Sequence, residues 1–414
     1  MKLTALFARQ IIDSRGNPTV EVEAMTATAR VRAIVPSGAS TGIYEAKELR
    51  DGGKRWRGLG VAKAVKNVNS VIAPKVIDQE FENQALFDAF LNALDKTADK
   101  SALGANAILG CSMAFSKLDA AMRGLSVYEH IALQTGNTPS LPVIYANVIN
   151  GGKHSGNGLP MQEFMLVPRE KHFADAVESI ANTYHELKTI IAKRYGSAAT
   201  SVGDEGGFAP PVKTAEESLT LLHDAAKAAG TSMKFAIDAA SSEFYDEKTK
   251  LYALHKPMSA DELRAYYATI VNDFGVVSLE DPFEQRAFTD FAALKKDFAD
   301  RRIKCQVVGD DLTVTNPVRI QQAIDAGSAN CLLLKINQIG TITEALNAAK
   351  LARSAGWNVM VSHRSGETDD AYISHLVVGL GCGQAKIGAP CRGERTAKYN
   401  ELLRIAESVK KYAV

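Results

Sequence analysis

The sequence predicts an α+β segment followed by a parallel α/β domain, most simply a (β/α)8 barrel. The chain of 414 residues suits two domains rather than one small core. Through its last two thirds, short apolar runs alternate with helical stretches. The length of that part fits the roughly 250 residues typical of such a barrel. A cluster of turn-forming residues at 134–140 separates the two parts, so we expect domains at 1–136 and 137–414.

The first part predicts strands and helices that are segregated along the chain. Residues 19–24 and 30–35 are rich in β-branched side chains, as strands are. Residues 36–42 form a loop of small residues after the second strand. Ala, Leu and Lys at helical spacing then predict helices over 60–76 and 100–134. This order indicates an α+β capping domain.

The second part predicts strands that each end in a polar or charged residue. These runs lie at 234–238, 276–281, 306–311, 331–337 and 358–364. Capping boxes predict helix starts at Thr214 with Glu217, at Ser259 with Glu262, and at Thr341 with Glu344. A doubly wound sheet is the competing architecture, but no Gly-rich strand-to-helix fingerprint supports it.

Composition excludes several classes of protein. The 48 Lys and Arg balance 47 Asp and Glu, and the net charge of +1 gives no overall field for nucleic acid or an anionic membrane. Five scattered cysteines without a C-x-x-C pair argue against a disulfide framework and a thiolate zinc site. The sequence shows no signal-peptide pattern and no apolar run of the roughly 20 residues that span a bilayer. We therefore expect a cytoplasmic protein with no membrane span.

Three carboxylates follow successive predicted strands: Asp238, Glu280 and Asp310. The carboxyl ends of barrel strands meet at one face, where barrel enzymes have their active sites. Oxygen-only ligands suit a hard cation, Mg²⁺ above all. Each acid taken alone is equally well explained as a helix cap or a loop acid. Two of them are doubled, by Asp281 and Asp311, which favours the metal site.

Basic groups follow the next three strands. Lys335 lies within an apolar run, where a buried amine needs a polar site, and burial with nearby cations would lower its pKa towards that of a general base. The alternative is a lysine that reaches solvent at the sheet edge. Arg364 and Ser365 offer a planar fork and a hydroxyl suited to phosphate, and Lys386 adds a point charge.

Earlier loops hold further polar candidates. Glu205 is flanked by glycines at 203–207, where the backbone can approach a ligand closely. A second loop contains His154, expected to be exposed when judged alone, and leads to Gln162 and Glu163. The loop at 37–42 lacks the spacing of a nucleotide-binding P-loop, and it is better explained as a mobile lid whose Ser40 hydroxyl serves a metal.

Taken together, these motifs resemble the enolase family. The resemblance is carried by SGASTG at 37–42, GDEGG at 203–207, SLEDPF at 278–283, DDLTVTNP at 310–317, LLKINQ at 333–338 and SHRSGET at 362–368. Long motifs in the same order over nearly the whole chain make a chance match very improbable.

The resemblance implies an N-terminal α+β cap and an enolase-type barrel whose first units depart from regular βα order. It implies a glycolytic lyase that interconverts 2-phospho-D-glycerate and phosphoenolpyruvate, with two Mg²⁺ per active site and a homodimer or larger homo-oligomer. Lys335 would take the C2 proton, and Glu205, supported by Glu163, would protonate the leaving hydroxyl. The remaining implied residues are Asp238, Glu280 and Asp310 for one Mg²⁺, Ser40 for the other, Arg364 and Ser365 for phosphate, and Lys386, His154, Gln162 and His363 in the pocket.

Two other functions stay open on the sequence alone. The chain could act on a different carboxylate, although Arg364, Ser365 and Lys386 argue for a phosphorylated substrate. It could also serve as a binding protein independent of catalysis, for which the sequence offers little beyond Lys410 and Lys411 near its end.

Overall fold

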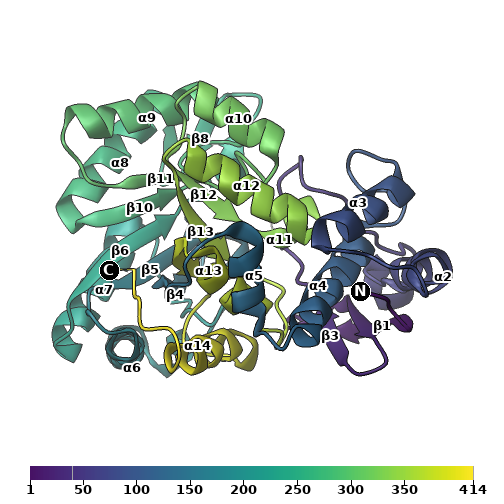
Figure 1. Ribbon diagram of the computed structural model, residues 1–414. Helices are drawn as coiled ribbons and strands as arrows, with labels where there is room; N and C mark the ends of the chain where they lie inside the picture. The colour runs from purple at the N-terminus through teal and green to yellow at the C-terminus, as the bar shows by residue number, and fades with distance from the viewer. Residues whose placement is uncertain (40, 414) are drawn as a thin grey trace.

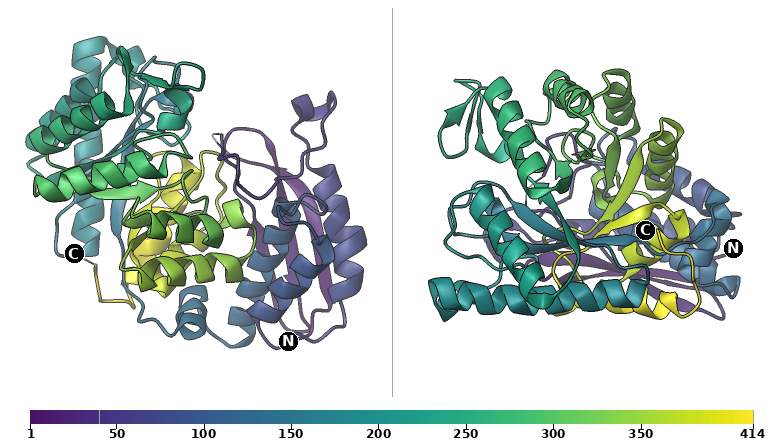
Figure 2. Two further views of the ribbon diagram at one scale, coloured as in Figure 1. Left: turned by 90° about the horizontal axis from the view of Figure 1, so that it is seen from above. Right: turned by 90° about the vertical axis from the view of Figure 1, so that its left-hand side faces the viewer.

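The computed structural model describes residues 1–39 and 41–413. A cap that contains the N-terminus lies to one side of a barrel, as Figure 1 and the left view of Figure 2 show. The cap begins with an antiparallel sheet of β1 (Ala5–Ile12), β2 (Pro18–Met25) and β3 (Arg30–Ile34). Helix α4 (Ala105–Met122) packs against β2 and β3.

The helical stretch predicted over 60–76 is continuous over 62–76, whereas the second predicted helix of the cap is broken. The stretch predicted over 100–134 is two helices, α4 and α5 (Val127–Thr135). The chain leaves the helix at Gly124, whose φ is +68°, and restarts at Ser126, whose hydroxyl accepts a hydrogen bond from Glu129 N in a capping box. The other helical segments are α1 (Ala62–Asn67), a π-helical turn (Val68–Ile72), α2 (Ala73–Val76) and α3 (Gln84–Asp95).

The second part of the chain forms a closed eight-stranded barrel, which confirms the predicted architecture and excludes the doubly wound sheet. Strand β5 (Glu163–Pro168) runs antiparallel to both of its neighbours, and all other neighbouring strands are parallel. The barrel therefore departs from regular βα order at its start. The other strands are β4 (Val143–Asn150), β6 (Met233–Asp238), β10 (Val276–Glu280), β11 (Gln306–Gly309), β12 (Cys331–Leu334), β13 (Asn358–Ser362) and β14 (Gly383–Lys386).

Helices cover the outside of the barrel (Figure 2). The capping boxes predicted at Thr214 and Ser259 both form, at the starts of α7 and α8. Thr341 caps α12 by accepting from Glu344 N at 3.2 Å. These helices are α6 (Phe173–Tyr195), α7 (Ala215–Ala229), α8 (Ala260–Phe274), α9 (Phe288–Asp300), α10 (Pro317–Asp325), the short α11 (Ile336–Ile339), α12 (Ile342–Ser354), α13 (Tyr372–Leu380) and α14 (Gly393–Ala406).

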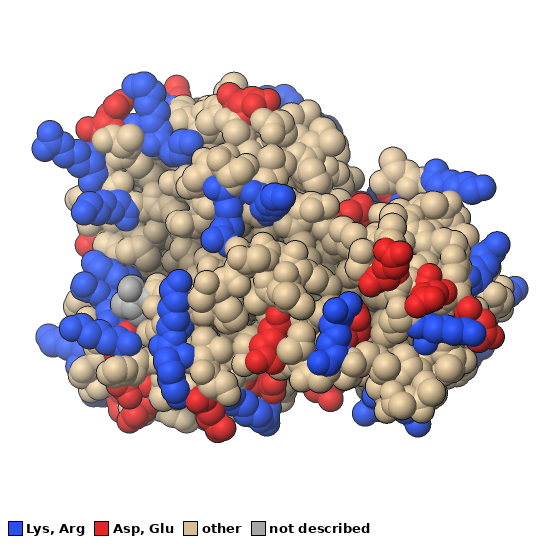
Figure 3. Space-filling view, viewed as in Figure 1, with Lys and Arg blue, Asp and Glu red and all other residues tan. Residues whose placement is uncertain are grey.

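The barrel interior is a packed core. Buried side chains from β4, β5, β6, β11, β12 and β13 form a hydrophobic cluster distinct from the larger core beneath the helices: Tyr145, Met165, Val167, Ala236, Val308, Cys331, Leu333 and Met360. Inward-pointing residues from alternate strands stack in layers in this kind of barrel. Within the described residues, no helix is long and apolar enough to cross a membrane. Both signs of charge are interspersed on the face shown in Figure 3.

Backbone and side-chain contacts place the cap over the carboxyl end of the barrel. Ser37 in the cap and Gly366 after β13 exchange two backbone hydrogen bonds, of 2.7 and 2.8 Å. Asp88 of α3 accepts a hydrogen bond from Thr343 N at 2.8 Å, so a side chain of the N-terminal domain satisfies a free N–H at the start of the barrel helix α12. Lys117 of α4 forms an ion pair of 2.7 Å with Asp370. The cap loop is thereby held beside the strand ends where the predicted site lies.

Candidate active site

The three predicted metal carboxylates lie at the carboxyl ends of neighbouring strands. Asp238 ends β6, Glu280 ends β10, and Asp310 directly follows β11. Asp238 pairs in register with Glu280 on one side and with Glu163 of β5 on the other. All of these carboxylates are buried. The strand-end rule thus brings the predicted acids to one face of the barrel.

Lys386, the last residue of β14, lies among these acids. Its Nζ is 3.0 Å from Asp238, 2.8 Å from Glu280 and 3.1 Å from Glu163. Burial lowers the pKa of this amine, but the surrounding carboxylates outweigh burial and raise it well above its ordinary value. Lys386 is therefore a fixed positive charge between Asp238 and Glu280.

Lys335 follows β12 and makes a short contact with Asp310. Asp310 also accepts from Gln338 Nε2 at 2.8 Å. Burial lowers the pKa of Lys335, yet the Asp310 carboxylate reverses the effect, so its pKa is raised. This direction belongs to an amine with a carboxylate beside it, whereas the sequence-based expectation of a lowered pKa concerns an amine next to metal ions and stays a prediction.

The donor set suits a hard cation. Among the described residues, two groups of side chains could hold a metal ion. Within each group the acidic or imidazole ligand atoms lie within 4.8 Å of one another, and one group consists of Asp281, Asp310 and Asp311. Asp281 accepts from the backbone N of Asp310 and of Asp311, at 2.9 and 2.7 Å. Burial and the neighbouring carboxylates raise the pKa of Asp311 to about 8. Such crowding of buried oxygens is relieved by Mg²⁺, which prefers carboxylate ligands.

The predicted triad of Asp238, Glu280 and Asp310 is not itself one of those groups. Lys386 lies between the first two, and Lys335 contacts the third. Ser40, predicted for a second Mg²⁺, lies outside the described residues. The predicted metal ligands thus share one buried face with two cationic side chains, and their carboxylate chemistry fits a magnesium ion.

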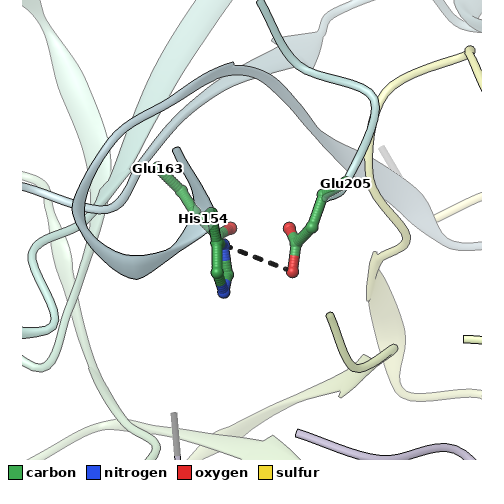
Figure 4. Close-up of side chains that lie close together, drawn as sticks. All are labelled: His154, Glu163 and Glu205. Carbon is green, nitrogen blue, oxygen red and sulfur yellow. Dashed lines mark ion pairs between the residues drawn. The ribbon is translucent and has the colours of Figure 1, made fainter. Parts of the chain in front are cut away.

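The second group consists of His154, Glu163 and Glu205. Figure 4 shows the His154 ring beside Glu163 and facing the Glu205 carboxylate. His154 Nδ1 lies 3.5 Å from each carboxylate. His154 is buried, so the expectation of an exposed histidine is wrong. The absence of a side chain at Gly203 lets the two loops approach closely, because a Cβ at Gly203 would lie 2.5 Å from the His154 carbonyl oxygen.

The pKa values of Glu163 and Glu205 are shifted in opposite directions. Burial, reinforced by the Glu205 charge, raises the pKa of Glu163 well above its usual range. Burial also opposes ionisation of Glu205, but His363 and His154 outweigh it and lower that pKa. His363 Nε2 lies 3.2 Å from Glu205 and Asn147 Nδ2 donates to it at 3.0 Å. Paired carboxyl groups with separated pKa values can hold and pass one proton.

The loop after β13 carries the side chains predicted to bind phosphate. Arg364 forms an ion pair with Glu45 of the cap, and Ser365 Oγ accepts from Ala39 N at 2.7 Å. Arg395 Nη1 lies 2.6 Å from His363 Nδ1 and donates to the Arg364 carbonyl at 2.5 Å. These contacts fix both the side chains and the backbone of this loop.

The predicted site residues therefore come together, apart from Ser40. Gln162 is also present, with Nε2 3.5 Å from Asp238. Sequence reasoning missed Glu45, Asn147, Gln338 and Arg395. Gln338 is within the LLKINQ motif and could have been found there. Nothing in the linear pattern singles out the other three, because their roles depend on neighbours remote in sequence.

Cavity size does not identify this site. The cavity among the charged groups measures only about 20 Å³, because Lys335, Lys386 and the carboxylates fill it. A larger cavity of about 610 Å³ lies between α3, α5 and α12, away from these groups. The convergence of buried titratable groups makes the first cavity the candidate active site.

Comparisons with known proteins agree with the geometry. Residues 3–131 match the family described as "Enolase, N-terminal domain", and residues 138–414 match "Enolase, C-terminal TIM barrel domain".

Similar curated proteins cover almost the whole chain. The enolase of Thermococcus gammatolerans is 50% identical over 419 residues, which cover 100% of this chain and 96% of that protein. The enolase of Mastigamoeba balamuthi is 51% identical over 423 residues, covering 98% of this chain and 96% of that protein. Enolase 1 of Entamoeba histolytica is 49% identical over 425 residues, covering 99% and 97%. The chain belongs to the enolase family and is a hydro-lyase that reversibly dehydrates 2-phospho-D-glycerate to phosphoenolpyruvate.

Proposed function

We propose that Lys335 removes the C2 proton of 2-phosphoglycerate and that Glu205 delivers a proton to the departing C3 hydroxyl. The observation that carries this proposal is the strand order of the barrel. Lys335 follows β12, and Glu163 begins β5. Glu205 lies on the same side as Glu163, because His154 contacts both carboxyl groups. These strands are four positions apart in a ring of eight, so they lie on opposite sides. A base and an acid on opposite sides favour anti elimination.

Lys335 needs help, since a hydrogen beside a carboxylate is only weakly acidic. Its removal places a second negative charge on the substrate's carboxyl oxygens. Lys386 is held at the centre of the site and opposes that charge as it develops. Two Mg²⁺ ions, one held by Asp238, Glu280 and Asp310 and one by Ser40, would supply further positive charge to the same oxygens.

The proton for the leaving hydroxyl comes from the paired carboxyl groups. Burial and the Glu205 charge raise the pKa of Glu163, which favours its protonated form. His154 lies 3.5 Å from both carboxyl groups and His363 contacts Glu205, so both imidazoles act on the acid. The proton reaches the hydroxyl through Glu205, with Glu163 as its reserve.

Arg364 and Ser365 bind the phosphate. The guanidinium matches phosphate oxygens through parallel N–H groups, and the hydroxyl adds a further donor. Gln162 and His154 line the pocket beside Asp238 and Glu205 and complete the contacts to substrate. Such a phosphate site accounts for a phosphorylated substrate rather than a plain carboxylate.

The remaining features of the proposal concern the protein as a whole. We assign 1–136 to the cap and 137–414 to the catalytic domain. We expect a homodimer or larger homo-oligomer in the cytoplasm, as the family resemblance implies. The net charge of +1 argues against a nucleic-acid partner. Light scattering on a sizing column measures the assembly, and a monomeric mass under assay conditions would contradict it.

Partial reactions test the two roles separately. Wild type should form the enol product, detected by ultraviolet absorbance, only when a divalent cation is present. Lys335→Ala should lose exchange of the C2 proton with deuterated solvent. Glu205→Gln should retain that exchange while losing dehydration. Exchange retained by Lys335→Ala would exclude Lys335 as the base, and a fully active Glu205→Gln would exclude Glu205 as the acid.

A further inference from the structure

Three consecutive residues of the cap each contact a different segment of the barrel. Ile43 N donates to Gln285 Oε1 at 3.0 Å. The ring of Tyr44 lies 3.9 Å from the Arg319 guanidinium. Glu45 pairs with Arg364. The segment Ile43–Glu45, which we name the anchor, therefore joins the cap to the regions after β10 and β13 and to α10.

Glu45 grips Arg364 by two parallel bonds. Arg364 Nη1 donates to Glu45 Oε2 at 3.0 Å, and Nη2 donates to Oε1 at 3.1 Å. Both side chains are buried. A bidentate pair fixes the plane of the guanidinium as well as its position. The direction in which Arg364 presents its N–H groups is thus set by a residue of the other domain.

The same carboxylate reaches towards the proposed base. Glu45 Oε1 accepts from Gly42 N at 3.0 Å and from Gln338 Nε2 at 3.4 Å. Gln338 also donates to Asp310 at 2.8 Å. Glu45 therefore links the cap loop, the phosphate-binding arginine and the amide that holds Asp310.

The stack of Tyr44 on Arg319 holds the anchor in place. Arg319 Nε donates to the Leu312 carbonyl at 2.8 Å, and Nη2 donates to the Gln285 carbonyl at 2.5 Å. These bonds keep the guanidinium plane fixed as a platform for the ring, an arrangement that is favourable for an arginine over an aromatic face. Gly42 approaches the barrel so closely that a side chain there would meet Val314 at 2.6 Å.

We propose that Glu45 is a positioning residue for phosphate recognition, and that the stack of Tyr44 on Arg319 sets its place. This rests on the proposed role of Arg364 as the phosphate ligand. Glu45 itself does not touch the substrate: it acts by orienting Arg364. Loss of its charge releases the guanidinium plane, which weakens binding of the phosphate more than it slows the chemical step.

The variants Glu45→Gln and Glu45→Asp test this effect. Glu45→Gln removes the charge at constant size, and we expect KM for 2-phosphoglycerate to rise about tenfold, with kcat within about threefold of wild type. The inhibition constant of inorganic phosphate should rise by the same factor as KM. Glu45→Asp keeps the charge and should recover part of both. Unchanged KM and phosphate inhibition in Glu45→Gln would overturn the proposal.

Asp370→Asn is the matched control for loss of a cap-to-barrel ion pair. It breaks the pair with Lys117 without touching Arg364. It should lower thermal stability and leave KM and phosphate inhibition unchanged. If it raises KM as Glu45→Gln does, the effect belongs to docking of the cap in general and the proposal fails.

Two variants of Tyr44 complete the test. Tyr44→Phe keeps the ring and should behave as wild type. Tyr44→Leu loses the stack and should raise KM about threefold. Equal KM values for the two would remove the stack from the proposal. Wild-type turnover and the partial reactions of Lys335→Ala and Glu205→Gln, measured first, test the proposed function separately, so an unchanged KM in Glu45→Gln then counts against the role of Glu45 alone.

Discussion

The two ends of the barrel satisfy their polar groups in opposite ways. At the amino end, Gln306 Nε2 donates to Gln384 Oε1 at 2.9 Å and to Ser278 Oγ at 3.0 Å, while Asn358 donates to Gln306 Oε1 at 2.9 Å. This network is neutral. At the carboxyl end, buried carboxylates surround Lys386, and burial, reinforced by neighbouring negative charges, raises the pKa values of Glu163 and Glu280.

The same strands serve both ends. β10 carries Ser278 and then Glu280, and β14 carries Gln384 and then Lys386. Side chains two residues apart lie on one face of a strand, so both members of each pair point into the barrel. The amino end thus forms its hydrogen bonds within the protein and stabilises the fold, whereas the carboxyl end keeps charges that a ligand can satisfy.

The largest effect is expected from removing a charge at the carboxyl end of the barrel. Glu280→Gln should reduce kcat about 10³-fold, as expected when charge stabilisation in a site is lost. In wild type, added Mg²⁺ should raise the melting temperature, because a ligand that binds the native state stabilises it. That rise should be absent or much reduced in Glu280→Gln. A full magnesium-dependent shift in the variant would contradict the assignment of Glu280 to the metal.

The next effect concerns the neutral end. Gln306→Leu removes the hydrogen bonds to Ser278, Gln384 and Asn358, and we expect a loss of about 1 kcal/mol in the free energy of unfolding, because water can solvate the partly exposed Gln384 and the exposed Asn358. Activity should stay within about twofold, because the reacting groups lie at the other end. Urea denaturation measures the stability change. The double variant Gln306→Leu with Gln384→Leu should recover part of it, since both partners are then apolar; a further loss would show that the amide network is not the cause.

The smallest effect comes from a pair that belongs to neither end. Glu401 of α14 lies 3.1 Å from His375 of α13. The hydrogen bond with His375, aided by Arg404, lowers the Glu401 pKa from 4.5 to about 2. A lowered carboxyl pKa stabilises the fold above pH 4.5, and this stability is lost as pH falls towards 2.

Glu401→Gln should cost about 1 kcal/mol at neutral pH, the modest value expected for a solvent-screened pair. Thermal unfolding between pH 2 and 7 should show a shallower acid dependence in this variant. Glu407→Gln, a nearby charge removal, is the control and should leave the slope unchanged. Identical acid profiles for Glu401→Gln and wild type would contradict the prediction.

Local pattern predicted most of the barrel and most of its reactive residues. Asp238, Glu280, Lys335 and Lys386 could be found because a strand end is visible in sequence as an apolar run that stops at a charge. The break between α4 and α5 was missed, since one Gly and one capping box interrupt an otherwise continuous helical spacing. Local spacing alone does not show whether such a signal ends a helix.

His154 shows the limit of local reasoning. Its neighbours are glycines and polar residues, so the sequence favours an exposed ring, yet the folded chain buries it between Glu163 and Glu205. Glu45 is a stronger case, because its partner Arg364 lies in the other domain.

By itself, the sequence determined the kind of barrel, the strand ends that hold acids and bases, and the family to which the chain is similar. These depend on periodicity and short motifs, which are local properties. Only the tertiary structure decided which charges meet: Lys386 with Asp238 and Glu280, Lys335 with Asp310, and Glu45 with Arg364. Protonation and orientation depend on distance and burial, and both arise only when segments remote in sequence pack together.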